Sequence, residues 1–261
     1  MAMLKVTGST SSSISVSKAP IGVVIIYGRG ADLGNFGVFA ENLRKDLVGK
    51  YGKNIEVKNI ERKADFFAYL STTKFAFQVK ELHIFCHSFG TGLALGYHDP
   101  IIAAKRNDFA RTRLDWYYQN SKYDQLYDDI IKLEEGILFI DDLINATTKK
   151  RVIQALFSPS NAFVKLWGCN SAVSGWEYDS NDVYWGALNY KRNPKPSIAQ
   201  TVATFCNVVC YGATSGSHVE VLDNGGWITS EAYGKKYAKK ASGTLMHRLQ
   251  PDKGGYVAYN P

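Results

Sequence analysis

The sequence predicts an α/β fold, a three-layer sandwich in which helices cover a mainly parallel central sheet. Residues 22–28 read GVVIIYG, a continuous apolar run that is typical of a strand buried on both faces. Apolar side chains then recur at helical spacing over residues 36–51 and stop before Gly52. Because residues 22–87 alternate strand, helix, strand, helix and strand, we expect a parallel sheet with helices packed on it.

The remaining elements follow along the chain. NIEVKNI at residues 54–60 predicts a strand, residues 64–70 a short helix, and ELHIFCH at residues 81–87 a third strand. The next segment, GTGLALGYHDP, favours a glycine-bounded β-hairpin. Later residues predict an apolar segment at 137–143, helices at 147–157 and 197–206, and strands at 163–170 and 207–216.

One domain is expected over residues 21–261. The chain has 261 residues, of which 45% are hydrophobic and 21% charged, as in ordinary globular proteins and unlike disordered or coiled-coil chains. Residues 1–20 are rich in serine and threonine and predict a flexible N-terminal segment. The polar stretch at about 100–135 predicts an insertion or lid beside the sheet.

Charge and hydropathy exclude several partners. The net charge is +7, but the basic residues are scattered, which favours a solvated surface over a nucleic-acid site. No apolar run approaches the ~18 residues of a membrane span. Residues 1–19 lack the apolar core of a secretory signal, so we expect a cytoplasmic protein, or one exported by a specialised system without a cleavable signal.

Four predicted strand ends carry small or reactive residues, and parallel strands bring such ends to one edge of a sheet. They are residues 28–30, 87–90, 168–170 and 213–218. The first, with Gly28, Gly30 and Gly34, is similar to a dinucleotide-binding motif, but Leu33 stands in place of the third glycine. We therefore interpret it as a turn, and expect no cofactor.

The second strand end admits a serine nucleophile. CHSFG at residues 86–90 is similar to the G-x-S-x-G elbow, with Ser88 as nucleophile and His218 as the later base. Asp141 or Asp182 would complete the triad in chain order. Against this hypothesis, Cys86 is bulky for a strained turn, and a hairpin rather than a helix is predicted to follow.

The third strand end admits a cysteine nucleophile. A thiolate needs only a nearby imidazole to accept its proton, and His87 and Cys169 meet that need if their strands are adjacent. Gly168 lets the backbone approach a substrate carbonyl, and amides after the cysteine are candidate oxyanion donors. Asn170, Ser215 and His218 are candidates for the same cleft. An inert buried Cys169 with a structural His87 remains the alternative.

Other reactive residues favour structural roles. His83 and His98 are expected to be structural or surface residues, and Cys86, Cys206 and Cys210 to be core thiols. The cysteine pair, four residues apart, lacks a second ligand pair, so no metal site is predicted. The tryptophans near Cys169 either line a pocket or pack the core; they are Trp167, Trp176 and Trp185.

ELHIFCHSFGTGLALG and FVKLWGCNSAVSG, followed by SIAQTVATFCNVVCYGATSG, resemble the caspase-like cysteine peptidases, especially bacterial CHAT-type domains and the self-cleaving domains of large toxins. In that family one strand ends in a histidine and a later strand in the nucleophilic cysteine. The resemblance implies a caspase-like fold with His87 as base and Cys169 as nucleophile. Ser88 stands where the family has glycine, which leaves the serine hypothesis open.

Three functions follow from these residues. The leading hypothesis is a cysteine peptidase acting on a protein or peptide, as a bacterial effector or toxin module with a cognate inhibitor protein. The second is a serine acyl hydrolase, an esterase or lipase that uses Ser88. The third is a caspase-like binding module without catalysis.

Overall fold

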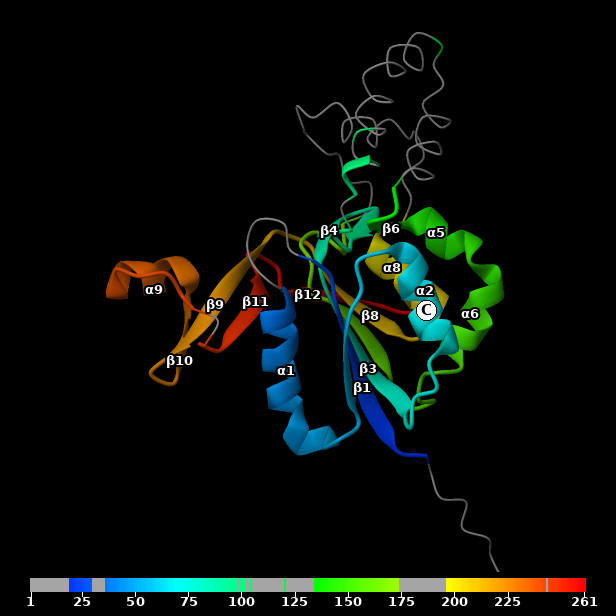
Figure 1. The fold of residues 1–261 in the computed structure, drawn as a ribbon, viewed down its shortest axis with the longest axis horizontal. Coiled ribbons are helices and arrows are strands. Elements are labelled where there is room, and N and C mark those ends of the chain that lie inside the picture. The colour runs from blue at the N-terminus through cyan, green and yellow to red at the C-terminus, as the bar shows by residue number, and fades with distance from the viewer. Residues whose placement is uncertain are drawn as a thin grey trace, which may run out of the picture.

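A six-stranded sheet forms the centre of the computed structural model (Figure 1). The structure describes residues 19–29, 36–97, 99–101, 104, 120, 134–173, 196–242 and 244–261. The strands lie in the order β12-β8-β7-β3-β1-β2, and each neighbouring pair is parallel except β12 and β8. Their bounds are β1 Ile21–Tyr27, β2 Ile55–Asn59, β3 Gln78–Phe85, β7 Phe163–Leu166, β8 Val209–Ala213 and β12 Tyr256–Tyr259. The predicted mainly parallel α/β sheet is confirmed.

Helices cover both faces of this sheet (Figure 1). On one face lies α1 (Phe36–Tyr51). The other face is covered by α2 (Lys63–Thr72), α5 (Ile140–Asn145), α6 (Thr147–Gln154) and α8 (Ile198–Cys206). Each helix adds apolar side chains to the core on its own side, so the sheet has one core above it and one below.

Strand β1 explains why the sequence there is apolar without alternation. Val24 and Ile26 belong to the core beneath α2 and α8, whereas Val23 and Ile25 belong to the core beneath α1. All four side chains are fully buried. A strand between two covered faces needs an apolar residue at every position, which is the pattern that predicted it.

A small antiparallel sheet follows β3. It consists of β4 (His87–Phe89), β5 (Gly92–Ala94) and β6 (Ile137–Phe139). The prediction of one strand through residue 87 is therefore wrong, because the chain bends at Cys86 and His87 opens β4. The segment GTGLALGYHDP, predicted to be a whole hairpin, supplies only one strand, β5, and its hairpin partner is the preceding strand β4.

The C-terminal region was not predicted from the sequence. A second antiparallel sheet of order β10-β9-β11 consists of β9 (Ser217–Asp223), β10 (Gly226–Thr229) and β11 (His247–Pro251), with α9 (Ser230–Tyr237) packed on it. It adjoins α1, where the Asn42 side-chain amide donates to the His247 carbonyl oxygen at 3.1 Å. This contact brings β9 and β11 to the α1 side of the central sheet.

Two predicted segments fall largely outside the described residues. These are the N-terminal segment of residues 1–20 and the insertion at about 100–135. Among the strands, the segment predicted at 163–170 ends at Leu166, and that predicted at 207–216 covers Val209–Ala213. Both predicted ends therefore lie beyond the last residue of the observed strand.

Candidate active site

The end of β3 places His87 at the edge of the α1-side core. After the bend at Cys86, His87 pairs with Ala94 in the small sheet, and its side chain is half-buried. The Phe36 ring of α1 contacts the imidazole edge to face, with ring centroids 5.0 Å apart and planes at 78°. The first turn of α1 therefore restricts how the imidazole is oriented.

The end of β7 places Cys169 in the neighbouring position. Strands β3 and β7 are parallel neighbours, with Ile84 opposite Leu166, and the Trp167 amide donates to the Ile84 carbonyl oxygen at 2.9 Å. Cys169 follows two residues later and is half-buried, and Asn170 then turns the chain with a left-handed φ of 54°. Asparagine tolerates this conformation better than most residues.

Gly168 joins the two strand ends. A β-carbon built on Gly168 would lie 2.4 Å from the Ser88 β-carbon and 2.7 Å from the Cys86 carbonyl oxygen. Only glycine allows the two backbones to come this close. His87 and Cys169 are each one residue from this contact, so the close approach holds the predicted base and nucleophile at adjoining positions.

The turn after Cys169 is held by Ser171, which is fully buried. Its hydroxyl donates to the Gly168 carbonyl oxygen at 3.2 Å and accepts from the Ala213 amide of β8 at 3.0 Å. The Asn170 amide donates to the Ser215 carbonyl oxygen at 2.8 Å, so this candidate oxyanion donor is already engaged. The turn is thus fixed to the end of β8.

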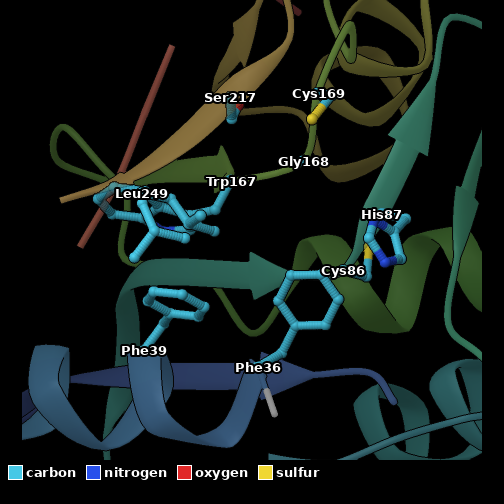
Figure 2. Close-up of a pocket in the computed structure, with 10 residues that line it drawn as sticks. Phe36, Phe39, Cys86, His87, Trp167, Gly168, Cys169, Ser217 and Leu249 are labelled. Carbon is cyan, nitrogen blue, oxygen red and sulfur yellow. The ribbon is translucent and has the colours of Figure 1, made fainter. Parts of the chain in front are cut away.

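A pocket of about 130 Å³ opens between these strand ends and α1 (Figure 2). His87, just after β3, and Gly168 and Cys169, just after β7, line it. The other lining residues come from α1, the ends of β3 and β7, and the C-terminal sheet; they are Phe36, Phe39, Cys86, Trp167, Ser217, Val219 and Leu249. The structure therefore brings the predicted cysteine and histidine to one cavity.

The four cysteines differ in environment. Burial raises the pKa of Cys86, with a smaller contribution from the nearby charge of Cys169. Burial also raises the pKa of Cys206 to about 12 and that of Cys210 well above its ordinary value. A protonated thiol is a poor nucleophile, and Cys169 is the one cysteine that is not buried.

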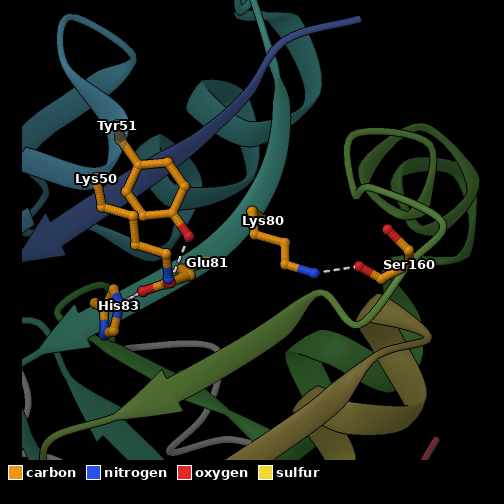
Figure 3. A network of polar contacts seen from close by, with 6 residues as sticks. All are labelled: Lys50, Tyr51, Lys80, Glu81, His83 and Ser160. Carbon is orange, nitrogen blue, oxygen red and sulfur yellow. Dashed lines mark hydrogen bonds and ion pairs between the residues drawn. The ribbon is translucent and has the colours of Figure 1, made fainter. Parts of the chain in front are cut away.

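A polar network, buried except for Lys50, joins the C-terminal end of α1 to β3 (Figure 3). The Glu81 carboxylate accepts from Lys50 at 2.8 Å and from the Tyr51 hydroxyl at 2.6 Å, and it lies 2.9 Å from Nε2 of His83. Burial alone would raise the pKa of Glu81, but the hydrogen bonds from these three groups lower it to about 2. The carboxylate is therefore ionised.

The tautomer of His83 follows from its second partner. The Trp167 indole nitrogen, which only donates, lies 3.2 Å from Nδ1 of His83. Nδ1 is therefore an acceptor and Nε2 carries the proton that it donates to Glu81. Burial lowers the pKa of His83, in agreement with this neutral form. The network thus fixes the indole that forms one wall of the pocket.

The other candidate residues lie outside this pocket lining. Ser88 lies within β4 of a hairpin, not at the strand-to-helix turn that a nucleophile elbow requires. His218 lies on β9, with Nδ1 2.9 Å from Asp252 and Nε2 3.6 Å from Glu220. The Ser215 hydroxyl accepts from the amide of Lys253 and donates to backbone oxygens.

The remaining predicted residues either do not line the pocket or lie outside the described residues. Asp141 lies in the first turn of α5, while Gly30, Leu33, Gly34, His98, Trp176, Asp182 and Trp185 lie outside the described residues. The residues that the sequence did not identify are the pocket walls on α1, β9 and β11. The spacing of apolar residues over 36–51 predicted the helix that forms the α1 wall. It did not show whether those side chains pack in the core or line a pocket.

Comparison with known proteins does not assign this chain to a family. Comparisons with protein-family models, with curated proteins and with solved structures found no match. Within the described residues, no group of three or more histidine, cysteine or acidic side chains is arranged to hold a metal ion. None of the described helices has the length and apolar character to cross a bilayer. Function is therefore inferred from the geometry of the site.

Proposed function

We propose that the protein is a cysteine hydrolase, a peptidase that uses Cys169 and His87. The observation that carries the proposal is their common pocket at the ends of two neighbouring parallel strands. Gly168 supports it, because its contact with the segment of residues 86–88 holds the two strand ends together. The caspase-like assignment is part of the same proposal and depends on the resemblance of the two motifs.

The reaction needs only these two side chains and water. The His87 imidazole accepts the thiol proton of Cys169, and the thiolate attacks the carbonyl carbon of a peptide bond. The C–N bond breaks, His87 returns the proton to the departing amine, and a thioester joins the acyl group to Cys169. Water then hydrolyses the thioester with His87 as base, which releases a carboxylic acid and restores the thiol.

Substitution at the two residues tests the proposal. Cys169→Ala should lower the cleavage of denatured casein or of a peptide library at least about 1000-fold, because it removes the attacking atom. His87→Ala should lower it about 100-fold or more, because it removes the base. Cys206→Ala is the matched control, since it removes a buried thiol of α8 that lies outside the pocket.

Labelling gives a second readout. Iodoacetamide should modify Cys169 faster than the three buried cysteines, as peptide mapping by mass spectrometry would measure, and His87→Ala should slow the modification. Cleavage that persists in Cys169→Ala would contradict the proposal. A fluorophosphonate that labels Ser88 would instead favour the serine hydrolase.

A further inference from the structure

The pocket beside Cys169 has the character of a substrate subsite. We propose that it binds an apolar side chain, of the size of leucine or phenylalanine, at one of the two residues that flank the scissile bond. This inference rests on the proposed peptidase function and names the class of peptide that it cleaves. Its evidence is the chemistry, rigidity and size of the pocket.

The pocket lining is apolar. Five of the ten described residues that line it are large and apolar, and no aspartate, glutamate, lysine or arginine is among the ten; the five are Phe36, Phe39, Trp167, Val219 and Leu249. A charged substrate side chain would leave water without gaining a partner of opposite charge, which is strongly unfavourable. An apolar side chain gains free energy from the same transfer.

Contacts from outside the pocket hold its walls in place. The Trp167 indole stacks on Phe85, with ring centroids 5.0 Å apart and planes at 9°, and its nitrogen donates to His83. The Lys165 ammonium lies 3.7 Å from the centre of the same indole. Because the wall is fixed before a peptide arrives, binding loses little conformational entropy.

The pocket also connects directly with the reacting residues. Phe36 lines it and contacts the His87 ring, while Trp167 is two residues before Cys169. A side chain seated here would belong to a residue at the bond under attack rather than to a distant part of the peptide. This placement is why we assign the subsite to a flanking residue.

Size and polarity set further limits. A cavity of about 150 Å³ holds a benzene ring, so a pocket of about 130 Å³ suits a leucine side chain or a phenyl ring. The Ser217 hydroxyl oxygen is buried at this pocket and has no hydrogen-bond partner among the described residues. It is available to donate to a carbonyl oxygen of the peptide backbone and so to orient the bound chain.

A peptide library with cleavage sites mapped by mass spectrometry tests the subsite in the full chain. We expect leucine, methionine or phenylalanine next to the cleaved bond at least about tenfold above aspartate, lysine and alanine. Leu249→Ala enlarges the pocket and should shift the preference towards tryptophan. Val257→Ala, on the exposed edge strand β12, is the matched control and should keep the wild-type preference.

The outcomes separate the two proposals. Cleavage that depends on Cys169 but shows no apolar preference, or a preference that Leu249→Ala leaves unchanged in a folded protein, overturns the subsite alone. If no peptide is cleaved and Cys169 is labelled at the same rate with and without His87, the peptidase function fails and the subsite fails with it. Circular dichroism of each variant identifies a loss of folding.

Discussion

At the residue scale, position 168 requires glycine because there is no room for a side chain. The glycine before Cys169 suggests from sequence that the backbone must approach a substrate. The structure shows a different close approach, to Cys86 and Ser88 of the same chain. The need for glycine was predictable, but its partner was not, because a contact between residues 80 positions apart depends on which strands are neighbours.

Gly168→Ala should therefore reduce activity strongly. Its new methyl group would overlap the Ser88 β-carbon and the Cys86 carbonyl oxygen, so the Cys169 turn must move away from His87. We expect kcat for peptide cleavage to fall about 100-fold, the usual effect of a displacement of about 1 Å. Gly49→Ala is the control, because nothing lies within 4 Å of its added carbon, and its place in α1 predicts a gain of up to about 1 kcal/mol. Equal activity in the two variants would contradict this account.

At the element scale, the sequence best predicts a strand that is covered on both faces and helices that carry a long apolar stripe. The sequence predicted the first strand, the helix that became α1, and the helix that became α8 within one or two residues. It missed the C-terminal sheet. Strand β9 reads SHVEVLD and buries only Val221 fully, so its hydrophobic pattern is weak. That sheet nevertheless supplies three of the pocket residues.

At this scale, the turn formed by residues 168–172 after β7 should be sensitive to the loss of Ser171. Ser171→Ala leaves the Ala213 amide and the Gly168 carbonyl without the buried hydroxyl that joins them. An unsatisfied buried donor costs about 1–3 kcal/mol, so urea denaturation should show a loss of this size. Cleavage should fall more than stability alone explains, since the turn also positions Cys169.

Ser197→Ala serves as the comparison for that variant. Ser197 accepts from the Gln200 amide as the N-cap of α8, so its loss should cost about 1 kcal/mol. The Ser197 hydroxyl bonds to the Gln200 amide and not to the Cys169 turn, and the variant keeps the Ala199 amide that donates to the Ser171 carbonyl oxygen at 2.9 Å. Activity at a temperature where both variants are folded should therefore stay close to wild type. If both variants lose the same activity, Ser171 acts only through stability.

At the scale of the whole molecule, one buried polar network links three elements of the fold. Lys50 and Tyr51 end α1, Glu81 and His83 lie on β3, and Trp167 follows β7. The alternating polar residues of ELHIFCH did not predict this network. A buried charge is recognised by its hydrogen-bond partners, and the sequence alone does not show which residues these are. The network makes the stability of the entire domain depend on pH.

The sign of this dependence follows from His83. Its folded-state pKa is below the ordinary 6.5 because of burial, so below pH 6.5 the unfolded chain takes up a proton that the folded protein does not. The free energy of unfolding should therefore fall as the pH drops from 7 to 5, and this one group contributes a slope of no more than about 1.4 kcal/mol per pH unit. Glu81, with a pKa of about 2 when folded, extends the loss below pH 4.5.

Urea denaturation of wild type and His83→Gln at pH 5, 6, 7 and 8 measures this contribution. Glutamine keeps a donor for Glu81 and an acceptor for Trp167 but does not titrate. The variant should lose less stability than wild type between pH 7 and 5, even if it is less stable at pH 7. Parallel pH curves would mean that the pKa of His83 is the same in the folded and the unfolded protein, so that the folded imidazole takes up a second proton at pH 5. In that state Nδ1 could not accept from Trp167, and the indole wall of the pocket would lose its fixed position.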